Sequence, residues 1–385
     1  MDYKKDFPIL DKTTYLDSAC MSLKPKQVVE AMNEYYFKFP GCAGRSSHKI
    51  SKEVTDKVSQ ARRNISKFIN TKKSEEIIFT RNTTEGLNLL CNSLKCKKVL
   101  LGPREHNSNL IPWLKHKKVE IINENKDYTL DLEDFAKKIK HTELVSLGWV
   151  SNLDGYILPV KEIIKEAHKH NVPVILDAAQ AAPHLEMNVK KLDVDYLCFS
   201  GHKMLGPTGV GVLYGKHELL EKLDTYNLGG DTVYDSTYTD YKLEEVPARF
   251  EAGLQDYAGI IGFSAAIDYL KKISMSKVEK HCNELTKYML EKAKDLDLVG
   301  INNPKIKTSI LSFNLKKANP HDVAMLLDAE NICVRSGAHC VHSWFNKNKL
   351  DGSVRASAYI YNTKEDIDKL FTSLKKIKTV LQWNK

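Results

Sequence analysis

Two stretches decide the fold of this chain: Val174-Ile175-Leu176-Asp177-Ala178-Ala179-Gln180 and, shortly after it, Asp195-Tyr196-Leu197-Cys198-Phe199-Ser200-Gly201-His202-Lys203-Met204. Each contains an apolar run of strand length that ends in polar residues. In a parallel sheet, the carboxyl ends of both strands open onto one crevice. The sequence therefore predicts that the Asp177 carboxylate and the Lys203 amine face the same site.

A carboxylate beside a nucleophilic lysine is what pyridoxal 5'-phosphate requires. The Lys203 amine can hold the cofactor aldehyde as a Schiff base, and Asp177 can keep the pyridine nitrogen protonated so that the ring accepts electrons. Glycines after the lysine, among them Gly206 and Gly209, allow tight turns close to a ligand. Taken alone, the lysine could instead be a surface residue in a glycine-rich turn.

Length and composition predict a large enzyme with two lobes. The chain has 385 residues, which exceeds the size at which a single core stops growing. We find neither an apolar run near the ~20 residues of a membrane helix nor the apolar core of a signal peptide at the start, so we expect a cytoplasmic location. The net charge of +9 comes from scattered lysines and indicates a solvated surface rather than a nucleic-acid footprint. We therefore expect neither nucleic acid nor membrane as a partner.

The eight cysteines lack the paired spacing of a zinc or iron–sulfur site, so no metal is expected. Most of them, such as Cys91 and Cys198, lie in apolar runs and are predicted to be reduced core residues. Cys340 is the exception because it lies in a polar loop beside Arg335 and His339. Such neighbours favour a thiolate, so Cys340 is either a nucleophile or an ordinary loop thiol.

The order of the elements predicts an α/β fold. Between Ile77 and Tyr214, short β-rich runs alternate with helical runs, which is typical of a mainly parallel sheet covered by helices. After Tyr257, two long helices and then mixed strands and helices predict a smaller α+β domain. We expect an N-terminal arm over residues 1–36 that contributes to the small domain, a large cofactor-binding domain over 37–256, and the small domain over 257–385.

Further candidate residues follow other predicted strands. Thr83 and Thr84 lie between a strand and a helical run, where hydroxyls and backbone amides can bind a phosphate or simply cap the helix. His106 follows the next strand and can stack on a pyridine ring and move protons, although an isolated histidine is usually a surface residue. Arg355 can grip a substrate carboxylate or form a salt bridge. Asn152 can assist the same carboxylate or be a plain turn residue.

With these residues in view, the chain resembles the class V aminotransferase group of fold-type I pyridoxal-phosphate enzymes. Within that group it is similar to the second group of cysteine desulfurases, the SUF-type enzymes, which also include selenocysteine lyases. The resemblance implies a large domain with a mainly parallel seven-stranded sheet. It extends along nearly the whole chain and rests on Tyr15-Leu16-Asp17-Ser18-Ala19, Thr83-Thr84-Glu85-Gly86, the Asp177 and Lys203 stretches, Arg249-Phe250-Glu251-Ala252-Gly253, Gly337-Ala338-His339-Cys340 and Arg355-Ala356-Ser357.

The resemblance implies a role for each candidate residue. Lys203 would carry the cofactor, Asp177 would pair with the pyridine nitrogen, and Cys340 would attack the sulfur of L-cysteine, leaving a persulfide and releasing alanine. By the same resemblance, Gln180 would contact the ring hydroxyl and His106 would stack on the ring. The phosphate would be held by Thr84, Ser200 and His202. The cysteine carboxylate would be bound by Asn152 and Arg355.

Two positions depart from the family pattern. Leu254-Gln255-Asp256 stands where the family usually has Thr-Pro-Asn, so the hydroxyl that reaches the partner subunit's phosphate is missing. Ala338 stands where a histidine often precedes His339 and Cys340. These departures bear on cofactor affinity, dimer contact and the activation of the thiol.

The sequence thus predicts a homodimeric, cytoplasmic cysteine desulfurase that passes sulfur from Cys340 to an acceptor or scaffold protein, as in iron–sulfur cluster assembly. Two alternatives stay open. One is a selenocysteine lyase, or another class V lyase, epimerase or aminotransferase, in which Cys340 is dispensable. The other is a catalytically degenerate scaffold for sulfur transfer.

Overall fold

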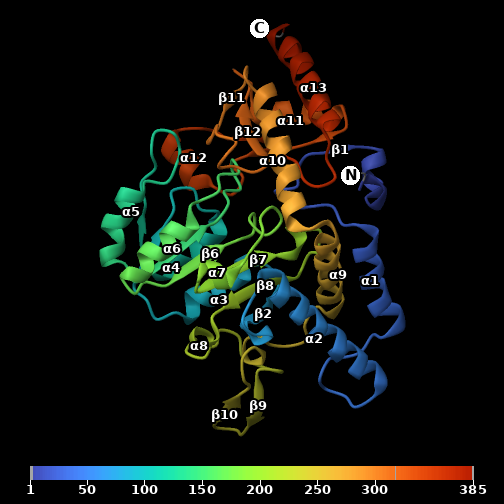
Figure 1. Ribbon diagram of the computed structural model, residues 1–385, viewed down its shortest axis with the longest axis vertical. Helices are drawn as coiled ribbons and strands as arrows, with labels where there is room; N and C mark the ends of the chain where they lie inside the picture. Colours follow the sequence, from blue (N-terminus) through green and yellow to red (C-terminus); the bar gives the residue numbers. More distant parts are fainter. Residues whose placement is uncertain (1–2, 317, 384–385) are drawn as a thin grey trace.

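The computed structural model describes residues 3–316 and 318–383. Its centre is a seven-stranded sheet with the strand order β2-β8-β7-β6-β5-β3-β4 (Figure 1). Only β8 runs antiparallel to its neighbours in this sheet. The predicted α/β fold with a mainly parallel seven-stranded sheet is therefore confirmed. The strands are β2 (Ile77–Thr80), β3 (Lys98–Leu101), β4 (Lys118–Ile121), β5 (Leu144–Gly148), β6 (Val174–Asp177), β7 (Tyr196–Ser200) and β8 (Gly211–Gly215).

Helices cover both faces of this sheet, so its central strands are apolar on both sides. Alternate residues enter different cores: Val174 and Leu176 pack into one cluster and Ile175 into another. The first cluster includes Ile163 of α6, and the second includes Leu87 of α3. The helices that follow these strands along the chain are α3 (Thr83–Ser93), α4 (Ile111–His116), α5 (Leu132–Lys138), α6 (Val160–Lys169), α7 (Val189–Leu192) and α8 (His217–Leu220).

A second, four-stranded antiparallel sheet lies beside the first (Figure 1) and has the order β11-β12-β15-β14. The arm at the start of the chain joins this part, because β1 pairs in parallel with β13. These elements are β1 (Thr14–Tyr15), β11 (Asp297–Leu298), β12 (Ile310–Asn314), β13 (Ile332–Cys333), β14 (Arg335–Gly337), β15 (Ser353–Ser357), α10 (Met275–Lys292), α11 (Pro320–Ala329), α12 (His342–Asn348) and α13 (Lys364–Trp383).

Three long helices pack together at the side of the large sheet: α1 (Lys26–Lys38), α2 (Lys49–Ile69) and α9 (Tyr257–Ile273). Ile260 and Phe263 of α9 belong to the same apolar core as the large sheet. A hairpin of β9 (Val233–Ser236) and β10 (Tyr241–Leu243) projects away from the body (Figure 1). The domain boundaries at 36/37 and 256/257 stay predictions. Within the described residues, every helix is too short or too polar to cross a membrane.

Candidate active site

The carboxyl ends of the central strands open onto a cavity of about 240 Å³. The arm and the second sheet complete its wall, the arm with Cys20 and the second sheet with Arg335 and Arg355. Ten of the predicted site residues line this cavity, and their individual roles stay predictions: Thr83, Thr84, His106, Asn152, Asp177, Gln180, Ser200, His202, Lys203 and Arg355. Cys340 is the predicted site residue that does not line it.

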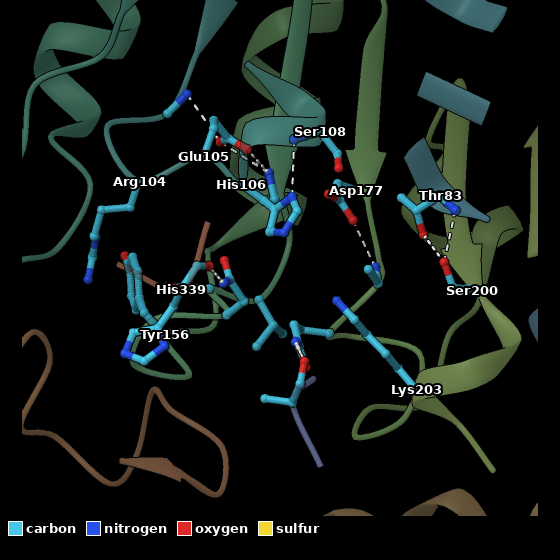
Figure 2. A pocket seen from close by; sticks show the side chains of 18 of the residues that line it. Thr83, Arg104, Glu105, His106, Ser108, Tyr156, Asp177, Ser200, Lys203 and His339 are labelled. Atoms are coloured by element: carbon cyan, nitrogen blue, oxygen red, sulfur yellow. Dashed lines mark hydrogen bonds between the residues drawn. The ribbon is translucent and has the colours of Figure 1, made fainter. Parts of the chain in front are cut away.

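Lys203 and Asp177 reach the cavity from neighbouring strands. Asp177 is the last residue of β6, and Lys203 ends the 3-10 turn that follows β7. Figure 2 shows the lysine side chain extending into the pocket toward the aspartate. Burial lowers the pKa of Lys203, and the charge of Asp177 opposes this shift. A lowered pKa makes the neutral amine, which is the nucleophilic form, more accessible.

The start of α3 forms an anion-binding corner of the cavity. Its cap is Asn82, whose side chain accepts a hydrogen bond from the Glu85 amide at 3.0 Å. The threonines are thus not the cap, which corrects that reading of the Thr-Thr pair, and their hydroxyls lie inside the first turn. The Thr83 hydroxyl lies 2.7 Å from the Ser200 hydroxyl, and the Thr84 hydroxyl lies 2.7 Å from that of Ser108. A helix N-terminus surrounded by hydroxyls is a favourable place for a phosphate.

His106 is a neutral imidazole at the ordinary working pH of a protein. Burial, reinforced by the positive charge of Lys203, lowers the pKa of His106 to about 3. Its Nδ1 accepts a hydrogen bond from the Ser108 amide at 3.1 Å, so the ring proton resides on Nε2. The ring lies beside Asp177 in Figure 2, where it can face a planar ligand.

Glu105 is a site residue that sequence reasoning did not single out. Its carboxylate is buried and accepts hydrogen bonds from the side chain of Asn109 at 2.7 Å and from the amide of Gly148 at 2.9 Å. Burial raises the pKa of Glu105 to about 7. These bonds tie the segment that carries His106 to the end of β5. No periodic pattern marks a residue of this kind, because its partners come from two separate places, the 3-10 turn after His106 and the end of β5.

Arg355 is buried, with 1% of its surface exposed, and two protein groups orient it. Its Nη1 donates to the Asn152 carbonyl at 3.0 Å, and its Nη2 donates to the Asp17 carboxylate at 3.1 Å. Its Nε is buried without a partner among the described residues. The Asn152 amide donates to the His339 carbonyl at 2.6 Å. The contact with Asp17 is the salt bridge that the sequence offered as one alternative for Arg355. The guanidinium still has a donor for a ligand.

Arg335 connects two thiols at the edge of the cavity. Its Nη1 donates to Cys20 Sγ at 3.4 Å, and its Nη2 donates to Cys340 Sγ at 3.5 Å. Burial lowers the pKa of Arg335, but the two sulfurs and Asp17 more than offset this effect and leave the pKa above its ordinary value. Cys340 and its neighbour Arg335 were candidates from the sequence, whereas no pattern in the sequence marks Cys20.

The loop around Cys340 has an unusual backbone. His339 and Cys340 have φ values of 49° and 60°, so two consecutive non-glycine residues occupy the left-handed region, which side chains disfavour. The Asn107 amide donates to the Cys340 carbonyl at 2.8 Å. This bond ties the cysteine loop to the segment that follows His106.

A buried ion pair supports the wall opposite the lysine. Arg104 pairs with Asp154, and the Arg104 Nε also lies 2.8 Å from the Glu124 Oε1. The Asp154 side chain is fully buried and accepts a further hydrogen bond from the Ile301 amide at 2.8 Å. Figure 2 shows Arg104 and Tyr156 on this side of the pocket.

Comparison with known proteins places this fold and site in a family. The model of the family "Aminotransferase class-V" matches residues 14–370, so the chain belongs to the class-V aminotransferase family. A probable cysteine desulfurase of Halalkalibacterium halodurans is 40% identical, over 98% of this chain and 97% of the relative. A protein of Pyrococcus abyssi with the same name is also 40% identical, over 95% of this chain and 94% of the relative.

Solved structures agree with this assignment. An apo structure of a cysteine desulfurase from Thermococcus onnurineus has a TM-score of 0.95 at 38% identity and covers 98% of this chain and 97% of its own. The structure of the Escherichia coli cysteine desulfurase CsdA, in an S-sulfonic acid form, has a TM-score of 0.91 at 30% identity and covers 98% of both chains. The fold-type I class expected from the sequence is therefore confirmed.

Proposed function

We propose that this protein is a pyridoxal-phosphate-dependent cysteine desulfurase, which converts L-cysteine to L-alanine and retains the sulfur as a persulfide on Cys340. The observation that carries the proposal is the placement of Lys203, Asp177 and Arg355 around one cavity. Relatives named cysteine desulfurase align over almost the whole chain, which supports the choice of this activity among those of the family.

The cavity fits pyridoxal phosphate because it offers a complementary group for each part of the cofactor. Asp177 would face the pyridine nitrogen, and Lys203 would bind the aldehyde. The Gln180 Oε1 is buried and has no partner among the residues that the structure describes, while its Nε2 donates to the Ala19 carbonyl at 2.6 Å, so this oxygen is available to the ring hydroxyl. The start of α3 would receive the phosphate, assisted by Thr83, Thr84, Ser200 and His202. When bound, the cofactor supplies an electron sink for the substrate carbon.

Arg355 and Asn152 would bind the carboxylate of L-cysteine. The guanidinium is buried, lines the cavity and is already oriented by Asp17, so its remaining N–H donors would bind the carboxylate at little cost in side-chain entropy. His106, being neutral with its proton on Nε2, would cover the ring and donate a hydrogen bond from Nε2 to a developing negative charge.

Cys340 would complete the reaction. Its sulfur forms a bond with the sulfur of L-cysteine while the carbon–sulfur bond of the substrate breaks. The carbon keeps the bonding electron pair, takes up a proton and leaves as alanine. Arg335 donates to the Cys340 sulfur and can stabilise the thiolate that starts this attack.

One observation favours a second candidate, a selenocysteine lyase or another class V lyase in which Cys340 is dispensable. Cys340 does not line the cavity, so chemistry that needs only Lys203 and the cofactor would also fit the site. The two candidates differ in whether turnover of L-cysteine requires the Cys340 thiol.

The proposal extends to the partners and the location of the enzyme. We propose a homodimer that acts in the cytoplasm and passes its persulfide sulfur to an acceptor or scaffold protein. Leu254 is 65% exposed at the position where the resemblance expects contact with the partner subunit's phosphate, which supports a surface of this kind.

Two measurements test the proposed function. Borohydride reduction of the protein loaded with pyridoxal phosphate should attach the cofactor permanently to the peptide that contains Lys203, and Lys203→Ala should abolish this attachment. Alanine release from L-cysteine should then be compared in the native protein, Cys340→Ser and the control Cys42→Ser. Loss in Cys340→Ser alone supports the persulfide mechanism, whereas unchanged turnover favours the second candidate. A protein that never binds the cofactor would instead be a scaffold.

A further inference from the structure

The guanidinium of Arg335 contacts two thiols, those of Cys20 and Cys340. Arg335 donates to Cys20 at 3.4 Å and to Cys340 at 3.5 Å. Because the two donors belong to one planar fork, the sulfurs can be separated by no more than about 9 Å. Both cysteines are half-buried. A rotation of either side chain, or a small shift of the Cys340 loop, would bring them closer.

Cys20 is the member of the pair that lines the cavity. The Ala19 amide donates to the Ser357 hydroxyl at 2.9 Å, and the Ala19 carbonyl accepts from Gln180. The backbone beside Cys20 is therefore anchored to the cavity wall. Cys340, by contrast, lies in the loop with left-handed backbone. The two thiols thus come from segments far apart in the sequence, and Arg335 lies between them.

The remaining cysteines do not share this environment. Cys91, Cys198 and Cys282 are buried in the apolar core. Cys42, Cys96 and Cys333 do not line the cavity. Lys203 interacts electrostatically with both Cys20 and Cys340, and Lys203 and Cys20 line the same cavity.

We propose that Cys20 is a second sulfur-carrying residue, which accepts the terminal sulfur of the Cys340 persulfide. This inference rests on the proposed function, because that function loads Cys340. The Cys20 thiolate attacks the terminal sulfur, so a bond forms between that sulfur and Cys20 while its bond to Cys340 breaks. The bonding electron pair leaves with the Cys340 sulfur as a thiolate. The proton of the Cys20 thiol passes to Cys340 or to solvent, and no oxidant or reductant is consumed.

Arg335 suits this exchange because it donates to both sulfurs. The guanidinium can stabilise the negative charge on Cys20 before the transfer and on Cys340 after it. With sulfur moved to Cys20, the Cys340 thiol is free for a second substrate. Each protomer would therefore store two sulfur atoms when no acceptor is present.

Peptide mass spectrometry tests the proposal on the loaded enzyme. The protein with bound pyridoxal phosphate is mixed with L-cysteine, quenched by alkylation and digested with trypsin. Cys20 and Cys340 then fall in separate peptides, residues 13–26 and 336–347. We expect an added sulfur on both peptides of the native protein, on the 336–347 peptide alone in Cys20→Ser, and on neither in Cys340→Ser. Cys42→Ser should match the native protein.

The alanine burst gives a second measurement that does not depend on peptide recovery. In the absence of an acceptor, the burst per protomer should be about twofold larger in the native protein than in Cys20→Ser. Sulfur on Cys340 with none on Cys20 in the native protein, together with an unchanged burst in Cys20→Ser, would overturn the proposal. So would a Cys20–Cys340 disulfide formed with release of sulfide. Absence of sulfur from Cys340 and of alanine would instead refute the proposed function.

Discussion

Replacement of Arg355 by lysine should weaken recognition of the substrate carboxylate while leaving the cofactor bound. Nη1 of the arginine donates to the Asn152 carbonyl and Nη2 to the Asp17 carboxylate, while Nε has no partner among the described residues. The oriented guanidinium therefore keeps N–H donors for the substrate carboxylate. A lysine keeps the charge but lacks the planar fork. The lysine ammonium can pair with Asp17 or with the substrate carboxylate, but it cannot hold both in the geometry that the guanidinium gives.

The size of the effect follows from the loss of one hydrogen bond to a charged group. Such a bond contributes about 1.5–3 kcal/mol, so kcat/KM for L-cysteine should fall by about 10- to 150-fold. Steady-state alanine release measures this ratio, and the absorbance of the bound cofactor shows that the site is otherwise intact.

The control is Arg62→Lys. Arg62 is also a largely buried arginine, paired with Glu251 at 2.8 Å, but it does not line the cavity. The Arg62→Lys substitution should lower the free energy of unfolding and leave kcat/KM for L-cysteine unchanged. If Arg355→Lys retained native kcat/KM with the cofactor bound, Arg355 would not be the carboxylate-binding residue.

Three further predictions concern stability and cofactor affinity. Asp154→Asn should lower the free energy of unfolding by about 1–3 kcal/mol in a urea titration, because it removes one of the two carboxylates that pair with the buried Arg104 and leaves only Glu124; a loss below about 0.5 kcal/mol would contradict this reasoning. Burial lowers the pKa of His184 to about 3, so its contribution to stability is fully present above pH 6.5 and is lost as the pH falls toward 3, by up to about 1.4 kcal/mol per pH unit. His184→Phe should flatten this slope in urea titrations at several pH values, and an unchanged slope would count against the histidine. A Cβ on Gly211 would lie 2.8 Å from the Asn82 backbone, so Gly211→Ala should displace the start of α3 and weaken cofactor binding by about tenfold; titration of the apo protein with pyridoxal phosphate would show an unchanged affinity if this is wrong.

Much of the fold and the centre of the site were predictable from local patterns. The runs that end at Asp177 and Ser200 are β6 and β7, and their parallel pairing brings Asp177 and the following Lys203 to one cavity. The prediction succeeds because the carboxyl ends of parallel strands must meet at one edge of the sheet. His106 and Thr83 reach the same cavity for the same reason.

Other features could not be predicted in this way. The reversed direction of β8 depends on how the turn after Lys203 packs, since an apolar strand reads alike in either direction. Glu105 was overlooked because its acceptor role depends on groups outside its own position, the amides of Gly102 and Gly148 and the side chain of Asn109. Cys340 lies outside the cavity lining because of the backbone of its loop. The sequence does not predict that backbone.

The sequence by itself determined the alternation of strands and helices, the family resemblance and the residues that meet at the strand ends, because periodicity and strand polarity are local properties. Only the tertiary structure decided that Asp17 orients Arg355 across 338 residues and that Arg335 joins Cys20 to Cys340. These contacts form where the arm packs against the second sheet. They depend on side-chain positions that no spacing along the chain encodes.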